Sequence, residues 1–313
     1  MTTRHLSISL RPLTAALLAG GWLGLLPLPG GAASAAYFWQ GWIDNSWIEA
    51  GNWDPPGPPT AGSGVMIALP DASVDFDSTA GFTYQSLYLS AWGGAAVLNQ
   101  AAHSLSFAEW VTIGLNADEF GTMNQSGASF SVGSLLGLGR DAGATGGYHL
   151  TGGSLTALGA TTVGIRGEGH LTIDGGTFEQ ATPDTLFLVG EGPTGWGRVD
   201  LKSGSLRMLG NEEKIGGGGT GYFYQSGGEH QFGGGLYVGD TGYGEYHMLG
   251  GSLGPVLDGG GNPVAYAGIV MGEWAGTGKF FHSGGTVDAD SVVLARQAGS
   301  TGLYEMSGDG AEL

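Results

Sequence analysis

A glycine-anchored motif recurs eight times along this chain of 313 residues, and it constrains the fold more than any other feature. A second motif consists of two apolar residues, one position apart, followed by Gly. It precedes most copies, and Leu136-Gly-Leu138-Gly139 is one example. A repeat of this length indicates a solenoid, in which stacked units bury an apolar face that one unit cannot bury alone. The eight copies begin at Gly121, Gly146, Gly169, Gly197, Gly221, Gly244, Gly278 and Gly302.

Within one copy the chemistry alternates with a period of two. The third and fifth positions are mostly apolar, as with Leu171 and Ile173, whereas the second and fourth are mixed and often polar, as with Arg198 and Asp200. This alternation places odd positions inside and even positions outside a strand. A Gly-rich pair then supplies the backbone angles of a corner. We therefore predict an all-β fold, a single-stranded right-handed parallel β-helix (β-solenoid) of about 24 residues per coil.

The local composition of the sequence divides the chain into three segments. Residues 1–35 have the form of a signal peptide, with Arg4 and Arg11 before an apolar run and Ala33-Ser34-Ala35 at the cleavage site. Residues 36–64 are rich in Trp and Pro, and we expect them to cap the first coil. Residues 65–313 hold the solenoid repeats, with an insertion loop at residues 254–267. A secreted or outer-surface location follows from this leader.

The C-terminal end of the sequence has no second aromatic segment. Tyr304 and Met306 of the last copy lie in the inward phase, and the chain stops seven residues later. An uncovered parallel edge is a template for another strand. We therefore expect a truncated solenoid, with an anchor or export domain beyond Leu313 or edge-to-edge self-association.

The charge restricts the partners. The chain holds 28 Asp and Glu against 10 Lys and Arg, a formal net charge of −18, and it has no Cys. Such an acidic surface repels nucleic acid and anionic lipid. An exported chain without Cys has no disulfide framework, so its stability comes from packing.

The opening and the repeats together resemble a known group of proteins. Trp47, Asn52-Trp53 and Pro55 are followed by Val65-Met-Ile67 and by repeats of the form Gly-x-Tyr-x-Leu/Met-x-Gly-Gly-Ser/Thr. This pattern resembles the β-helical region of autotransporter passengers and of PEP-CTERM-sorted exoproteins. The resemblance implies a surface or matrix protein, and it carries over no catalytic residue or cofactor.

Metal-ligating residues do not cluster in the sequence. His149 and His247 share the outward fourth position on coils that are not adjacent, and His282 takes an inward position that suits a hydrogen-bonded core residue. A zinc site needs three or four converging ligands, so we predict no metal site. Two Asp-x-Asp pairs are expected to decorate a solvated strand edge: Asp75/Asp77 and Asp288/Asp290.

A polysaccharide lyase or hydrolase is the least favoured hypothesis. Hydrolysis needs paired carboxylates at a defined separation. The densest mixed group, Arg198, Asp200 and Lys202 with Asp174 one coil away, has the pattern of an exposed charge ladder. We therefore predict no catalytic residue and no cofactor.

Two hypotheses for function remain, and both involve the outer surface. The first is a non-catalytic structural or adhesive rod whose partner is an extracellular polysaccharide or a host or cell-surface component. The alternative is a carbohydrate-binding β-helix in which Trp196, Tyr243 and Trp274, from the loop before the motif Gly, stack on sugars. Outward Tyr222, Tyr224 and Phe281 would add to that surface, although packing over neighbouring coils is the favoured explanation of such rings.

Overall fold

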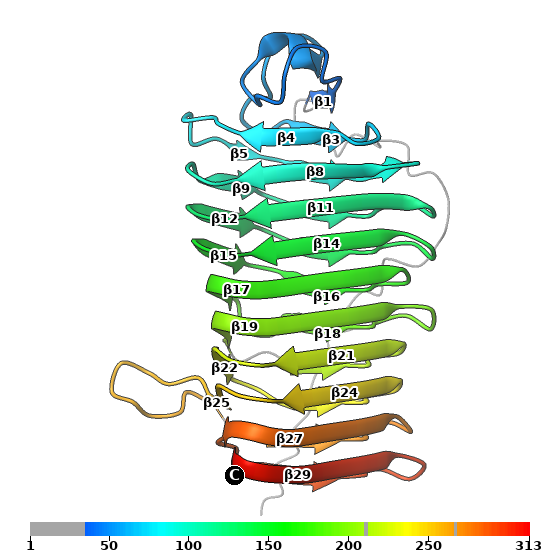
Figure 1. The fold of residues 1–313 in the computed structure, drawn as a ribbon, viewed down its shortest axis with the longest axis vertical. Helices are drawn as coiled ribbons and strands as arrows, with labels where there is room; N and C mark the ends of the chain where they lie inside the picture. The colour runs from blue at the N-terminus through cyan, green and yellow to red at the C-terminus, as the bar shows by residue number, and fades with distance from the viewer. Residues whose placement is uncertain (1–34, 210–211, 266–267) are drawn as a thin grey trace, which may run out of the picture. The chain divides into compact units, whose positions relative to one another are not determined.

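The structure, a computed structural model, describes residues 35–313 except 210–211 and 266–267. The expected signal peptide therefore lies outside the described residues apart from Ala35. The rest forms a parallel β-solenoid of about 11 turns with about 25 residues per turn, which confirms the predicted fold. In Figure 1 the near strands run to the left and the strands behind them run to the right as the chain descends, so the coil is right-handed. No helix in the described part of the chain is long and apolar enough to cross a membrane.

Each coil has three sides, and side 1 is a sheet of 12 strands in which all but the first pairing are parallel. The second motif lies in its middle strands, the first copy being Val111-Thr-Ile113-Gly114. Its members in spatial order are β2 (Trp53–Asp54), β1 (Ala36–Trp39), β3 (Gly64–Ile67), β6 (Ser86–Leu89), β10 (Trp110–Ile113), β13 (Leu135–Leu138), β16 (Ala160–Val163), β18 (Leu186–Val189), β20 (Glu212–Ile215), β23 (Leu236–Val238), β26 (Gly268–Met271) and β28 (Ser291–Leu294).

Sides 2 and 3 lie before and after the Gly corner, and several strands run around that corner without a break. Side 2 holds β4 (Ser73–Phe76) and β8 (Ala95–Gln100), followed by strands that carry the first motif: β11 (Glu119–Gln125), β14 (Thr145–Leu150), β21 (Thr220–Gln225) and β24 (Tyr243–Met248). Side 3 holds β5 (Thr83–Tyr84), β9 (Leu105–Phe107), β12 (Ser129–Val132), β15 (Ser154–Ala157), β22 (Glu229–Phe232) and β25 (Ser252–Pro255). Both sides share β17 (Glu168–Gln180), β19 (Trp196–Met208), β27 (Thr277–Val287) and β29 (Thr301–Glu312), while β7 (Ala91–Trp92) pairs antiparallel with β11.

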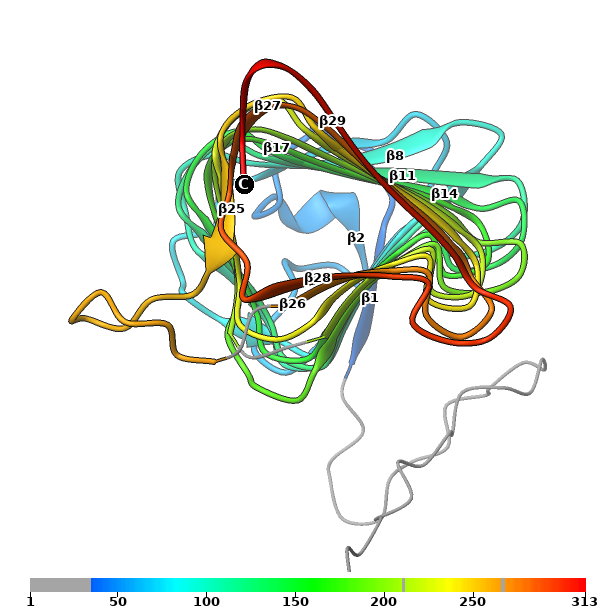
Figure 2. The ribbon, with the colours of Figure 1, turned by 90° about the horizontal axis from the view of Figure 1, so that it is seen from below.

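The core is the space that the three sides enclose, and the coils superpose around it in the end-on view of Figure 2. The third and fifth motif positions point into it as predicted; Leu171 and Ile173, for example, are buried. Aromatic rings at the third position stack along the axis in the C-terminal half. Their centroids lie 4.6 Å apart for Phe223 and Tyr246, 4.7 Å for Tyr246 and Phe280, and 5.0 Å for Phe280 and Tyr304.

The N-terminal aromatic segment covers the first coil and also extends side 1, since β1 pairs in parallel with β3. The Trp47 ring is fully buried and meets Phe76 and Tyr84 edge to face, at 5.1 and 5.4 Å between centroids. The short helix η1 (Ala50–Asn52) follows it. Asp77, expected on a solvated edge, instead anchors this segment: its carboxylate accepts hydrogen bonds from Ser46 Oγ and from the Ile48 amide.

Two features differ in detail from the expectation near the C-terminus. Gly254 and Pro255 remain in strand β25, because they pair with Gln231 and Phe232, so the excursion begins at Val256. It protrudes from the stack as the orange loop of Figure 1. The Met306 side chain, inward in phase, is 46% exposed because no further strand of the described chain lies over β29.

Candidate functional site

The outward side chains of side 2 form three columns, because the strand register is unbroken from β11 to β29. Column 0 holds the residue before the motif Gly, column 2 the second position and column 4 the fourth. Neighbours in one column lie on adjacent coils, about 4.8 Å apart. In order from β11 to β27, column 0 is Phe120, Thr145, Glu168, Trp196, Thr220, Tyr243 and Thr277; column 2 is Thr122, Gly147, His170, Arg198, Tyr222, Glu245 and Lys279; column 4 is Asn124, His149, Thr172, Asp200, Tyr224, His247 and Phe281.

The aromatic residues of column 4 stack on one another. The Tyr224 and His247 rings lie 4.6 Å apart and 12° from parallel, and the His247 and Phe281 rings lie 4.9 Å apart. The Arg198 guanidinium lies 4.4 Å from the Tyr224 centroid. Because the flat faces cover each other, mainly ring edges reach the solvent. This packing is a stabilising ladder along the axis and offers little flat surface to a sugar.

The three predicted sugar-stacking residues do not form one platform. Trp196 and Tyr243 are the first residues of β19 and β24, so they lie in strands rather than in the loop that the sequence suggested. The Trp196 ring lies 5.7 Å from Tyr222, and Lys279 Nζ lies 4.9 Å from the Tyr243 centroid. Trp274 lies in the turn between β26 and β27 and is 59% exposed. Of the three, it is the ring most open to a ligand.

Of the predicted charge ladder, the structure shows one ion pair, which lies within strand β19 rather than between coils. Arg198 donates two hydrogen bonds to Asp200, of 2.7 and 2.8 Å. Asp174, expected near Lys202, lies in register with Ser203 and accepts a hydrogen bond of 3.3 Å from its hydroxyl. The carboxylate of Asp200 is thus paired with a guanidinium. Across residues 35–313, with the four undescribed positions excepted, no three His, Asp or Glu side chains gather to hold a metal ion.

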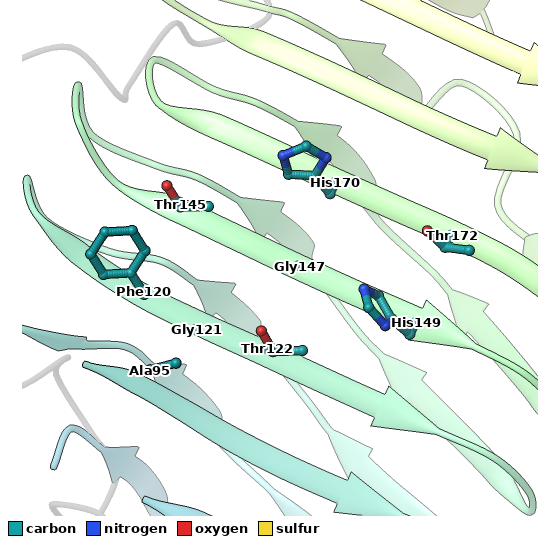
Figure 3. Close-up of a pocket in the computed structure, with 9 residues that line it drawn as sticks. All are labelled: Ala95, Phe120, Gly121, Thr122, Thr145, Gly147, His149, His170 and Thr172. Carbon is teal, nitrogen blue, oxygen red and sulfur yellow. The ribbon is translucent and has the colours of Figure 1, made fainter. Parts of the chain in front are cut away.

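A depression of about 330 Å³ opens on side 2 just before the aromatic part of the columns. It lies over Gly147, whose missing side chain leaves a gap in column 2 between Thr122 and His170 (Figure 3). The Phe120 ring and His149 also line it. We call this depression the Gly147 groove. The sequence analysis did not identify it, although the alignment of the motif copies shows Gly147 where other coils carry a side chain.

The two histidines of the Gly147 groove differ in their surroundings. His170 Nε2 lies 2.8 Å from Glu168 Oε1, and its ring contacts Trp196 at 5.1 Å. Partial burial lowers the pKa of His149, and the nearby His170 and Lys202 lower it further. This shift favours the neutral imidazole of His149, in which one ring nitrogen donates and the other accepts a hydrogen bond.

The sequence analysis also did not identify a pair of polar side chains buried in the core. Glu213 and His230 are fully buried, with 2.8 Å between Glu213 Oε2 and His230 Nε2, and His230 Nδ1 lies 3.0 Å from the Tyr246 hydroxyl. Glu213 takes the position that Phe187 and Leu236 occupy in the two neighbouring coils. Because Glu213 replaces an apolar residue, the second motif is not recognisable in the sequence of that coil.

Comparison with known proteins adds no relative to this description. No protein-family model, curated protein or solved structure matches the chain.

Proposed function

We propose that the chain is an exported, non-catalytic structural or adhesive rod. The observation that carries this proposal is the way in which the outward side chains of side 2 interact along the axis. Arg198 binds Asp200 and covers Tyr224, and the Tyr224, His247 and Phe281 rings stack in turn. The ring contacts hold one coil to the next, and the ion pair within β19 leaves Arg198 and Asp200 paired with each other.

A polysaccharide at the cell exterior is the partner that this surface favours. The net charge of −18 disfavours nucleic acid and anionic lipid. Exposed aromatic side chains remain on the outer surface, among them Phe120 at 43% and Trp274 at 59%. Rings of this kind bind the apolar faces of sugars. A carbohydrate-binding rod is therefore the form of the proposal that these two residues favour.

Export and retention on a surface test the proposal together. The full chain would be expressed in a Gram-negative host, and the secreted product would be identified by N-terminal sequencing and by its retention on polysaccharide-coated beads. We expect a mature N-terminus near Ala36 and an intact, folded protein on the beads or in the extracellular matrix. Accumulation of an unprocessed, cytoplasmic protein would overturn the proposal. The variant Trp274→Ala, with Trp42→Ala as a matched exposed tryptophan on the N-terminal segment, would show whether the Trp274 turn contributes to retention.

A further inference from the structure

The glycine at position 147 is not required by the backbone. A Cβ there would meet its nearest atom, Thr122 Oγ1, at 3.6 Å, an ordinary van der Waals contact. At the preceding residue, Gly146, a Cβ would lie 1.9 Å from the Ile113 carbonyl oxygen, which no side chain permits. A glycine inside a strand costs stability, because it packs no side chain and loses more backbone entropy. The structural effect of having glycine at position 147 is therefore to leave this hollow open in the surface of side 2.

Several groups around this hollow have no partner among the described residues and can bind a ligand. Phe120 stands at one side with 43% of its surface exposed, and it stacks on no other ring in the described part of the chain. The hydroxyls of Thr122, Thr145 and Thr172 form no hydrogen bond to other described residues. This contrasts with Tyr224, which lies between Arg198 and His247, and with His247, which lies between Tyr224 and Phe281. Figure 3 shows the Phe120 ring, the threonines and both imidazoles around the bare backbone of Gly147.

The chemistry of these groups selects the ligand class. An aromatic ring beside several hydroxyl and imidazole groups matches a pyranose, which has an apolar face and a rim of hydroxyls. A volume of about 330 Å³ lies at the small end of ligand sites and suits one or two sugar rings. The carboxylate of Glu168, next to His170, and the net charge of −18 both disfavour an anionic sugar.

From this geometry we propose that the Gly147 groove binds a neutral sugar unit of an extracellular polysaccharide. Phe120 stacks against the sugar ring, and the three threonines with His149 and His170 bind its hydroxyls. The inference rests on the proposed adhesive function, and it moves the sugar site from Trp196, Tyr243 and Trp274 to the preceding coils.

Two substitutions test the groove without disturbing the fold. Gly147→Thr fills it with a strand-forming side chain, and Phe120→Thr introduces the residue that column 0 already has at Thr145, Thr220 and Thr277. Leu303→Thr, at the far end of column 2, is the matched control. The secreted full chain and each variant would be titrated with soluble neutral glucan, mannan and xylan, and with polygalacturonate and hyaluronate as acidic probes.

We expect binding to at least one neutral polymer, weakened roughly tenfold or more by each groove variant and unchanged by Leu303→Thr. The thermal midpoint of Gly147→Thr should equal or exceed that of the parent, which separates loss of binding from loss of folding. Binding that survives Gly147→Thr but disappears in Trp274→Ala would overturn the inference, and so would a preference for the acidic probes. If no polymer binds while the exported protein stays intact on cells, the groove proposal fails and the rod proposal stands. Cleavage of any probe would instead overturn the rod proposal.

Discussion

Two columns of glycine meet where side 1 turns into side 2. Gly164, directly after β16, has φ of +77°, and a Cβ on it would lie 2.1 Å from the Trp196 carbonyl oxygen. A Cβ on Gly197, the motif glycine of β19, would lie 2.1 Å from the Val163 carbonyl oxygen. Successive coils therefore pass backbone against backbone at this point. The two motifs recognised in the sequence are the two halves of one contact.

Adjacent glycines should consequently respond in opposite ways to the same substitution. Gly146→Ala places a methyl group against the Ile113 carbonyl, and we expect it to lower the free energy of unfolding by about 1–3 kcal/mol, the usual cost of overpacking. Gly147→Ala should be neutral or stabilising, by about 0.5–1 kcal/mol. Urea unfolding of both variants checks this pair. Equal destabilisation by both variants would show that the backbones of successive coils do not pack as closely at Gly146 as described.

The buried Glu213 and His230 pair gives a second prediction for individual residues. Glu213 Oε1 has no hydrogen-bond partner among the described residues, so the carboxylate depends on His230. His230→Leu should cost roughly 3–5 kcal/mol, because it leaves a buried polar group alone. The double variant Glu213→Leu/His230→Leu restores the residue types of neighbouring coils and should recover much of that loss. A double variant less stable than the single one, in the same unfolding assay, would contradict this account.

At the scale of the element, a polar side chain at the fifth motif position secures the Gly corner. Gln225 Nε2 donates to the carbonyls of Gly228, at 3.3 Å, and of Ser252 on the next coil, at 2.8 Å. His282 has the same role, with its two ring nitrogens 2.9 Å from the Gly285 carbonyl oxygen and 2.8 Å from the Tyr304 hydroxyl. The sequence predicted His282 as a hydrogen-bonded core residue, and the structure confirms it.

The inner tyrosines make the strands of side 2 sensitive to alkali. Burial raises the pKa of Tyr148 and of Tyr246 well above the usual value, with Glu213 adding to the effect at Tyr246, and burial raises the pKa of Tyr304 to about 12. The unfolded chain releases these protons near pH 10, earlier than the folded chain. Stability should therefore be complete below about pH 10 and fall as the pH rises beyond it.

Tyrosinate absorbance, recorded with circular dichroism during an alkaline titration, checks this prediction. The buried tyrosines should ionise together with the loss of β-structure, after the exposed tyrosines have titrated. Ionisation of every tyrosine near pH 10 with the β-signal intact would show that Tyr148 and Tyr246 are accessible to solvent.

At the scale of the whole molecule, the repeat predicted the coil and its inward residues, because a fixed phase repeated eight times overrides local ambiguity. The handedness was predicted from the general right-handed preference of parallel crossovers. The state of the outer surface could not be predicted in the same way. Whether Tyr224 is a free ring or a covered one depends on Arg198 and His247 on the adjacent coils and on their rotamers. The Gly147 groove depends likewise on what stands above and below one glycine.

The excess of acidic residues gives a prediction for the molecule as a whole. With 28 Asp and Glu against 10 Lys and Arg, self-repulsion outweighs the surface ion pairs, each of which is worth little. Sodium chloride at about 0.15 M shortens the screening length to about 8 Å. The thermal midpoint should therefore rise from low salt to that concentration. A falling midpoint would mean that ion pairs such as Arg207 with Glu179, at 2.8 Å, dominate instead.

Turnover is the most direct test of the central claim, that this solenoid binds at its surface and catalyses nothing. The full chain would be incubated with neutral and acidic polysaccharides, and both reducing ends and unsaturated products would be measured over time, with Asp200→Asn as the comparison. The account predicts no product from either protein. Product formed by the parent chain and abolished by Asp200→Asn would contradict it, because it would place a catalytic carboxylate in the ladder of side 2.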